Sequence, residues 1–194
     1  MSGEQRLTTE PTRRRLTERQ ADTVRRLTDA AVEEVREAGY EGLTVRNVAR
    51  RAGVAPATAY TYFASKNHLI TEVFWRRLSA LAPVDADGPL LDRVVAVLRE
   101  IALLVSDEPE LGAACTTAML GTDPDVRELR VRIGAAIRER IQAALRDQDD
   151  PKIVGALELA YTGALVHAGM GYTSYARMAD RLAEMAKLIL PDPE

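Results

Sequence analysis

The sequence contains few of the residues on which catalysis and metal binding usually depend. It has one cysteine, Cys115, and only two histidines, His68 and His167, in 194 residues. A lone cysteine excludes a disulfide within the chain, and it suits a reducing compartment in which the thiol packs as a small apolar group. We find no cluster of metal ligands, no Gly-rich phosphate loop and no nucleophile paired with a base. The sequence therefore predicts no catalytic residue, no metal site and no cofactor.

Long hydrophobic runs are also missing. Charged residues interrupt every apolar stretch well before the roughly 20 residues that a membrane-spanning helix needs. The polar start, MSGEQRLTTEPTRRR, lacks the apolar segment of a signal peptide. We therefore expect a cytoplasmic protein without a membrane partner. The chain is nevertheless 46% hydrophobic, which is enough to bury a substantial core.

Positive and negative charges are distributed unevenly along the chain. Residues 1–80 contain 14 Lys and Arg against 10 Asp and Glu, a net charge of +4, whereas residues 81–194 contain 12 against 19, a net charge of −7. This asymmetry favours a first part that meets a polyanion and a second part that does not. The alternative is a scatter of solvated surface charge without a partner.

Apolar residues recur at helical spacing along most of the chain, without strand-like alternation and without an internal repeat. The predicted fold class is therefore all-α. Caps, glycines and prolines divide the pattern into nine helices, expected at about 18–38, 45–52, 56–62, 66–78, 89–106, 109–121, 124–145, 151–171 and 173–190. Asp123 and Asp150 stand as caps directly before prolines, and Gly39 ends the first helix.

Composition divides these helices into two domains. Residues 1–16 lack an apolar period and contain the run TRRR, so we expect a flexible basic arm there. Thr17 then begins a capping box with Gln20. The polar stretch APVDADGP at 82–89, with its prolines and glycine, is the best internal boundary. We place a first domain at 17–80 and a second at 88–194.

The most informative stretch is TVRNVARRAGVAPATAYTYF at 44–63. Two short helices separated by Gly53 and packed on a longer first helix make a helix-turn-helix. Gly53 fits the turn because glycine adopts a positive φ without a Cβ clash. The residues expected to face inward include Val48, Ala49, Val54, Ala59 and Phe63. The residues expected to face outward are Thr44, Arg46, Pro56, Ala57, Thr58, Tyr60, Thr61, Tyr62 and Lys66.

The outward-facing set has the chemistry of a surface for duplex DNA. An arginine such as Arg46 pairs with guanine in the major groove, whereas hydroxyls such as those of Thr44 and Tyr60 bind phosphates and fix the register. Lys66 offers a point charge for a phosphate. The alternative, which we favour for Phe63 alone, is that the aromatic residues of this stretch belong to the core. His68 is expected at an exposed helix position, with a phosphate contact as the alternative.

Residues 39–74 resemble the DNA-binding domain of TetR/AcrR-family transcriptional regulators. The residues that carry the resemblance are Gly39-Tyr40, Thr44, Val48-Ala49, Ala52-Gly53-Val54, Thr58, Tyr60, Tyr62-Phe63, Ser65-Lys66 and Leu69. The pattern is long and ordered, and the similarity extends over about 18–78. The remainder of the chain matches the family in length and number of helices.

This sequence departs from the family pattern at the start of the recognition helix. Ala55 stands where the family often has a capping serine, and the loss of such a cap costs about 1 kcal/mol. Ala57 and Ala59 replace the commoner Gly and Leu. Because base contacts from this helix are sparse, we expect specificity to depend on Arg46, Thr58 and the shape of the DNA.

The resemblance implies a homodimer in which a tetR-type helix-turn-helix domain at 17–80 precedes a domain for effector binding and dimerisation at 88–194. The last two helices would form a four-helix bundle between subunits. Small residues in the helix expected at 151–171 support this close packing. The predicted dimer residues are Gly155, Leu159, Gly163, Met178, Leu182 and Met185. The alternative is that both apolar stripes belong to the core of one subunit.

An effector pocket would lie among the fourth to eighth helices. Its candidate residues are Trp75, Leu98, Ala102, Cys115, Met119, Ile133, Ile137, Tyr161 and His167. For His167, a hydrogen-bonded place in the core is the alternative. The shortage of buried charge indicates an apolar or amphipathic small molecule.

The function that these features predict is sequence-specific transcriptional regulation. A repressor dimer on a palindromic double-stranded DNA operator would be released when a small-molecule effector shifts its conformation. The alternative is an effector-independent dimeric DNA-binding protein whose C-terminal part serves only dimerisation or protein contacts. An enzyme is disfavoured, because acid-base chemistry would rest on carboxylates that resemble solvated helix faces.

Overall fold

The computed structural model describes residues 18–84 and 87–190, so the basic arm expected at 1–16 and the cap expected at Thr17 lie outside the described residues. Within these ranges the chain forms nine α-helices and no strand, which confirms the all-α prediction. The helices are α1 (Glu18–Gly42), α2 (Val45–Arg51), α3 (Pro56–Tyr62), α4 (Lys66–Ser79), α5 (Leu90–Ala102), α6 (Pro109–Met119), α7 (Pro124–Leu145), α8 (Pro151–Gly169) and α9 (Tyr175–Ile189).

Short polar side chains start several of these helices, as the sequence predicts for Asp150, whereas the cap at Ser174 was not predicted. The side-chain oxygens of Thr44, Ser65, Asp150 and Ser174 each accept a hydrogen bond from a backbone N–H in the first turn of α2, α4, α8 and α9. Each cap satisfies one donor that the helix cannot satisfy itself. Gly39 takes a positive φ of 66° and interrupts α1, where the sequence predicts the end of the first helix.

Two predicted details of the helix ends are wrong. Asp123 stands before α7 but does not cap it, because its carboxylate instead accepts a hydrogen bond from the Asn67 side chain at 3.0 Å. That hydrogen bond holds the pKa of Asp123 below its usual range. The fifth helix is shorter than expected, since α5 ends at Ala102 and a single 3₁₀ turn, Leu103–Val105, follows.

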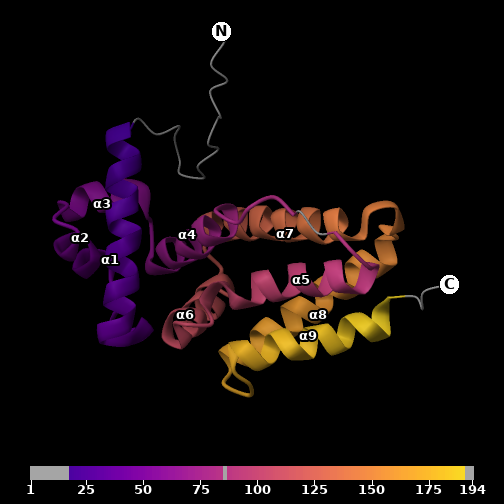
Figure 1. Cartoon of the computed structure of the whole chain (residues 1–194). Helices are drawn as coiled ribbons and strands as arrows, with labels where there is room; N and C mark the ends of the chain where they lie inside the picture. The colour runs from indigo at the N-terminus through magenta and orange to yellow at the C-terminus, as the bar shows by residue number, and fades with distance from the viewer. Residues whose placement is uncertain (1–17, 85–86, 191–194) are drawn as a thin grey trace, which may run out of the picture.

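The helices form two groups joined by α4 and α6 (Figure 1). The first three helices make a small unit at one end, with α2 packed against both α1 and α3. A longer bundle of α5, α7, α8 and α9 extends away from that unit. Helix α4 packs against α1, α6 and α7, while α6 also packs against α1 and α8. These two helices therefore place both groups on one continuous buried core.

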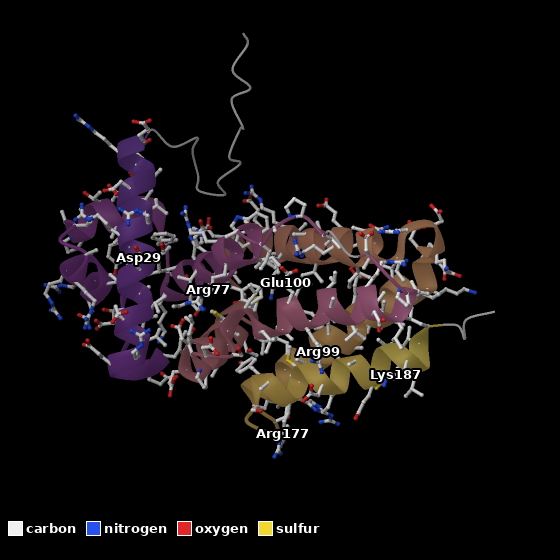
Figure 2. The ribbon with its side chains drawn as sticks, in the orientation of Figure 1. Asp29, Arg77, Arg99, Glu100, Arg177 and Lys187 are labelled. Atoms are coloured by element: carbon white, nitrogen blue, oxygen red, sulfur yellow. The ribbon has the colours of Figure 1, made fainter. Side chains whose placement is uncertain are left out.

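Charged side chains lie mostly on the outside of this bundle (Figure 2). Several join neighbouring helices: Arg99 of α5 binds Asp180 of α9 at 2.5 Å, and Arg138 of α7 binds Glu158 of α8 at 2.5 Å. Such exposed pairs contribute little stability, so apolar burial remains the main term. In the part of the chain that the structure describes, no helix combines the length and apolarity needed to cross a bilayer.

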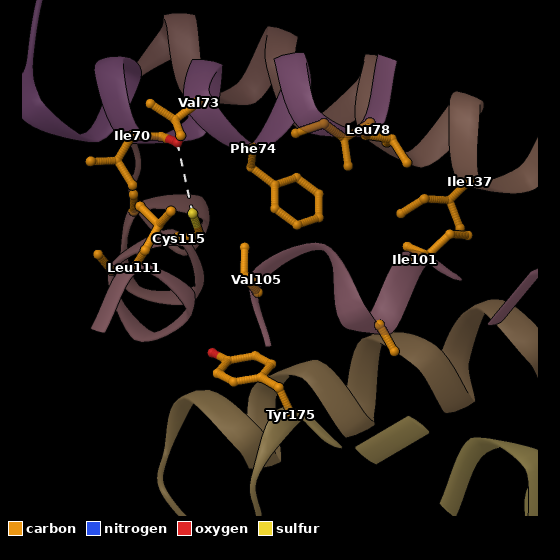
Figure 3. Close-up of a cluster of buried hydrophobic side chains, with 14 of the residues drawn as sticks. Ile70, Val73, Phe74, Leu78, Ile101, Val105, Leu111, Cys115, Ile137 and Tyr175 are labelled. Atoms are coloured by element: carbon orange, nitrogen blue, oxygen red, sulfur yellow. Dashed lines mark hydrogen bonds between the residues drawn. The ribbon is translucent and has the colours of Figure 1, made fainter. Parts of the chain in front are cut away.

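Close packing of α6 against α9 depends on a glycine. Gly112 of α6 faces the ring of Tyr175, and a Cβ at this position would lie 2.5 Å from two atoms of the ring. The Tyr175 hydroxyl lies 3.4 Å from the Thr116 hydroxyl, one turn further along α6. Figure 3 shows Tyr175 beneath the buried side chains of α4, α5 and α6.

We predict that Gly112→Ala destabilises the protein by about 1–3 kcal/mol, because the added methyl group would overlap the Tyr175 ring. The matched control is Gly134→Ala on α7, where nothing lies within 4 Å of the added Cβ. There the better helix propensity of alanine should stabilise the protein by about 0.5–1 kcal/mol. Urea unfolding of both variants at one protein concentration measures the difference. Equal stabilities would show that α6 and Tyr175 are not closely packed.

Candidate nucleic-acid interface

The residues predicted to contact DNA lie at the surface of α2, α3 and the segments beside them. Seven of them are exposed: Thr44, Arg46, Pro56, Ala57, Thr58, Tyr60 and Thr61. Tyr62 is half-buried, whereas the ring of Tyr60 remains half exposed. Phe63 is fully buried, as predicted, and Ala59 is buried beneath α3. The structure therefore brings the predicted set onto an accessible surface.

The turn between α2 and α3 has the geometry that the sequence predicts. Gly53 has a positive φ of 63°, and the backbone N–H of Val54 donates to the carbonyl of Ala49 at 2.9 Å. Ala55 occupies the position before α3 and provides no side-chain cap, while Pro56 begins the helix. Proline is favoured there because its fixed φ suits a helix and its missing N–H has no partner to lose.

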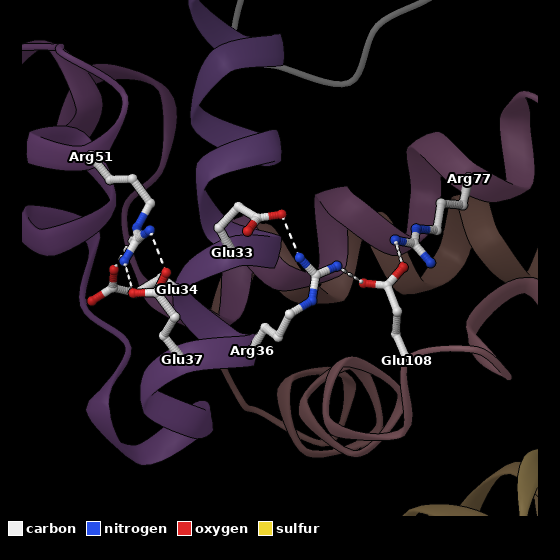
Figure 4. A network of polar contacts seen from close by, with 7 residues as sticks. All are labelled: Glu33, Glu34, Arg36, Glu37, Arg51, Arg77 and Glu108. Carbon is white, nitrogen blue, oxygen red and sulfur yellow. Dashed lines mark hydrogen bonds and ion pairs between the residues drawn. The ribbon is translucent and has the colours of Figure 1, made fainter.

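The arginines of α2 differ in their partners. Arg51 is bound to α1: its Nε donates to Glu34 Oε2 at 2.9 Å, and its guanidinium also pairs with Glu37 (Figure 4). This pairing raises the pKa of Arg51 and lowers that of Glu37. Arg46 and Arg50 are exposed and pair with no carboxylate among the described residues.

Arg50 is a candidate phosphate contact that the sequence interpretation missed. Arg46 and Arg50 are four residues apart, a spacing that places both on one face of α2. Arg51 lies on the side of α2 that faces α1, where it pairs with the buried Glu34. The four-residue spacing from Arg46 is the sequence pattern that predicts Arg50, rather than Arg51, on the same face of α2 as Arg46.

Two residues at the start of α4 lie differently from expectation. Lys66 is half-buried: its Nζ donates to the Tyr40 carbonyl at 2.9 Å and lies 4.2 Å from the centre of the Tyr40 ring. Lys66 thus fastens α4 to the end of α1, and a phosphate contact by it stays a prediction. The expected exposure of His68 is wrong, because its ring is buried edge-on against Phe63, with ring centres 5.4 Å apart.

Most residues proposed for an effector pocket lie in the core of the second group of helices. Trp75 and Met119 pack half-buried at its edge, and the buried residues are Leu98, Ala102, Cys115, Ile133, Ile137 and Tyr161. Burial raises the pKa of the Cys115 thiol to about 12, so this thiol is unreactive at neutral pH. The Tyr161 hydroxyl is buried and has no hydrogen-bond partner in the part of the chain that the structure describes.

His167 does not belong to that buried group. It is exposed on α8, where its ring meets Tyr172 edge-on with ring centres 5.7 Å apart. It lines a groove of about 300 Å³ between α8 and α9. The core alternative for His167 is therefore wrong, because α8 has one exposed face, whereas a ligand contact by His167 stays a prediction.

The predicted dimer residues around this groove fall into two kinds, exposed and buried. Leu159, Gly163 and Met185 are exposed and Gly155 is half-buried, with open space beside both glycines. Met178 and Leu182, by contrast, are only 0% and 1% exposed. They lie on the face of α9 that packs within the subunit and reach only the floor of the groove. For these two residues the alternative of an internal core is correct.

Polar contacts connect α1, on which α2 packs, to the segments before and after α6. Glu108, just before α6, accepts from Arg77 of α4 at 2.6 Å and pairs with Arg36 of α1 at 3.4 Å (Figure 4). Beyond the other end of α6, the Tyr40 hydroxyl donates to Asn67, which donates to Asp123 at 3.0 Å. The segment before α6 is thus tied to α1 and α4, and the residue before α7 is tied to α1 through Asn67 of α4.

Comparisons with known proteins agree on one kind of protein. The family model for bacterial regulatory proteins of the tetR family matches residues 27–73. An HTH-type transcriptional regulator of Mycobacterium tuberculosis is 53% identical over 175 residues, which cover 89% of this chain and 82% of that protein. The HTH-type transcriptional repressor KstR of Rhodococcus jostii is 26% identical over 180 residues, covering 89% of this chain and 85% of KstR.

Solved structures share the fold. A TetR transcriptional regulator from Rhodococcus sp. RHA1 superposes with a TM-score of 0.69 at 24% identity, over 84% of this chain and 95% of that one. The regulator FadR of Bacillus subtilis, solved in complex with stearoyl-CoA, superposes with a TM-score of 0.65 at 15% identity, over 86% of this chain and 99% of FadR.

We predict that Arg46→Ala lowers the affinity for a specific DNA duplex by about 5- to 150-fold, because a bidentate arginine–guanine pair contributes about 1–3 kcal/mol. Tyr60→Phe, which removes one hydroxyl, should lower it by only about 2- to 10-fold. Fluorescence anisotropy with a duplex enriched from a random-sequence pool measures both effects. Lys152→Ala, an equal loss of charge at the exposed start of α8, is the control and should change little. Unchanged binding by Arg46→Ala and Tyr60→Phe would remove this surface from consideration.

Proposed function

This chain belongs to the TetR family of bacterial regulatory proteins and is a DNA-binding transcriptional regulator rather than an enzyme, and from that premise we propose that it is a homodimeric repressor released from its operator by a small ligand. The observation that carries the proposal is the polar connection between α1, on which the DNA-facing helix α2 packs, and the segments before and after α6. Glu108, before α6, pairs with Arg36 of α1 and Arg77 of α4, and Asp123, before α7, is bound through Asn67 of α4 to Tyr40 of α1.

The open face of α8 and α9 supports a second copy as the partner. Leu159 of α8 and Met185 of α9 are 76% and 43% exposed and line the same groove, and exposed apolar side chains gathered on one face mark interaction sites. Gly155 and Gly163 leave open space along α8, so another helix can approach its backbone. A two-fold pair also doubles the phosphate contacts that one short recognition helix can make.

The buried core supports an apolar or amphipathic effector. Cys115 and Tyr161 belong to the cluster of buried hydrophobic residues, in which apolar side chains predominate. The unpartnered Tyr161 hydroxyl is the exception, since a buried polar group normally has a partner. An oxygen or nitrogen of a bound ligand would satisfy this hydroxyl. Stearoyl-CoA is a reasonable first probe, because a structural neighbour has been solved with it.

The route of release follows from the contacts around α6. A ligand that binds better when α6 is displaced moves Glu108 and Asp123 with it. Arg36 and Tyr40 then carry the change to α1, on which α2 packs. The ligand favours a dimer whose recognition helices are wrongly spaced for the operator, and linkage lowers DNA affinity by the same factor by which DNA lowers ligand affinity. The effector-independent alternative differs in one measurable respect, namely that no ligand changes DNA binding.

We predict that Leu159→Asp converts the dimer to a monomer and weakens operator binding, because a charge would be buried at the centre of the helix pairing. Leu120→Asp is the matched control, since Leu120 is also exposed but follows α6, away from the α8–α9 face. Size-exclusion chromatography with light scattering gives the mass of each variant. A dimer that survives Leu159→Asp would contradict the proposed interface.

We predict that Tyr161→Phe stabilises the ligand-free protein by about 1–3 kcal/mol, because it removes a buried hydroxyl without a partner. The same change should reduce the rise in thermal midpoint that an effector causes. Thermal unfolding with stearoyl-CoA, stearate and coenzyme A separates the parts of the probe, and DNA anisotropy then tests release. A ligand that stabilises the protein but leaves DNA binding unchanged would favour the effector-independent alternative. A less stable ligand-free Tyr161→Phe variant would show that the hydroxyl has a partner.

A further inference from the structure

We propose that Arg26 of α1 is a positioning residue for DNA recognition, which sets the angle of α3 by holding the turn between α2 and α3. One nitrogen of its guanidinium, NH2, donates to the carbonyl of Ala52 and, at 3.2 Å, to the carbonyl of Gly53. These two carbonyls lie 26 and 27 residues further along the chain, at the point where α2 ends. The proposal deepens the DNA-binding function and rests on it.

The turn has few other supports. Helix α3 has seven residues, buries only Ala59 and begins without a side-chain cap. Its packing is mainly against α2, which is also seven residues long. An isolated helix of this length is not stable in water, so contacts from outside must fix its direction. The backbone N–H groups of Ala52, Gly53 and Val54 donate to carbonyls of α2 and close the turn from within. Arg26 adds the hydrogen bonds that join the turn to α1.

The guanidinium fits this turn closely. The carbonyls at the end of a helix lack intrahelical partners and carry partial negative charge, so a cation is favoured there. A Cβ at Gly53 would lie 3.3 Å from Arg26 NH2, which means that the side chain lies against the bare backbone of the residue with positive φ. Glycine at 53 and arginine at 26 are therefore spatially matched.

Arg26 differs from the arginine beside it. Arg25 pairs with Asp22 at 2.6 Å and Asp29 at 3.6 Å, all on the outer face of α1. Arg26 binds only backbone oxygens and pairs with no carboxylate in the ranges that the structure describes. Arg25→Gln and Arg26→Gln each remove one positive charge at neighbouring positions. Only Arg26→Gln also alters the hydrogen bonds to the turn.

The consequence concerns specific binding. Base contacts from α2 and α3, such as those proposed for Arg46 and Thr58, need α3 to be in register with the groove. Contacts to phosphates alone tolerate a change in the direction of α3. Loss of the Arg26 contacts should therefore weaken binding to the preferred sequence more than binding to any other duplex.

The experiment compares Arg26→Gln, Arg26→Lys and Arg25→Gln in the full chain. Anisotropy is measured on a duplex that the unchanged protein enriches from a random-sequence pool and on a shuffled duplex, over a series of salt concentrations. We expect Arg26→Gln to lower affinity for the enriched duplex about tenfold or more, to change affinity for the shuffled duplex less than about twofold, and to leave the salt dependence unchanged. Arg26→Lys should restore only part of the loss, and Arg25→Gln should leave both affinities within about twofold.

Other outcomes overturn the proposal. Equal losses in Arg26→Gln and Arg25→Gln, or full rescue by lysine, would show that only charge matters. A salt slope reduced by about one would make Arg26 a phosphate contact instead. If Arg26→Gln unfolds the helix-turn-helix, amide exchange of Val54 in Arg26→Lys decides, because a positioning role requires faster exchange there than in the unchanged protein. Failure of the unchanged protein to enrich any duplex would contradict DNA binding itself, a result distinct from all of these.

Discussion

A seven-residue helix is not stable alone in water, so α2 and α3 depend on contacts from outside for their orientation. The DNA-facing surface of this protein therefore depends on the contacts that α1 provides. Two polar connections accompany the apolar contact between α1 and α2. Arg51 reaches from α2 to Glu34 and Glu37, and Arg26 reaches from α1 to the turn. The apolar core beneath, with Val48 and Phe63 fully buried, resists separation of the helices but does not fix their rotation. Directional hydrogen bonds can fix it, because their energy depends on angle as well as distance.

Helix α1 makes two sets of contacts. One set orients α2 and α3, and the other reaches the segment in front of α6. Arg36 lies between Glu33 of its own helix and Glu108 in front of α6. Arg77 binds both Glu108 and the Leu104 carbonyl, so α4 is held to the loop between α5 and α6. Exposed ion pairs add little to stability. We infer that their contribution here is to make the position of α1 depend on that of α6, as the proposed response to a ligand requires.

The sequence was sufficient for the helices and for the surface of the helix-turn-helix, because both depend on local rules. Caps and prolines mark the helix starts, and Gly53 marks a turn that needs positive φ. The sequence was insufficient where a residue has several possible partners, some of them distant in sequence. Asp123 satisfies the pattern of a cap but binds Asn67, which is distant in sequence. His68 is polar yet fills space beside Phe63. Met178 and Leu182 satisfy the pattern of an interface stripe, but periodicity does not distinguish a neighbour in the same subunit from one in another.

Glycines in helices show the same ambiguity most clearly, because a glycine can serve packing within the subunit or packing against a second copy. The surroundings of each glycine distinguish the two cases. Gly112 and Gly169 lie where a Cβ would overlap Tyr175 or Thr116, so packing within the subunit accounts for both. Gly155 and Gly163 lie in helix α8 with nothing within 4 Å of an added Cβ. Each costs about 0.5–1 kcal/mol relative to alanine in a helix, and nothing in the described part of the subunit offsets that cost. A helix from a second copy, packed close to the α8 backbone between Leu159 and the exposed edge of α9, would offset it. Gly134 of α7 is equally open, so the argument for a second copy at α8 depends on the exposed Leu159 and Met185, which line one groove with Gly163.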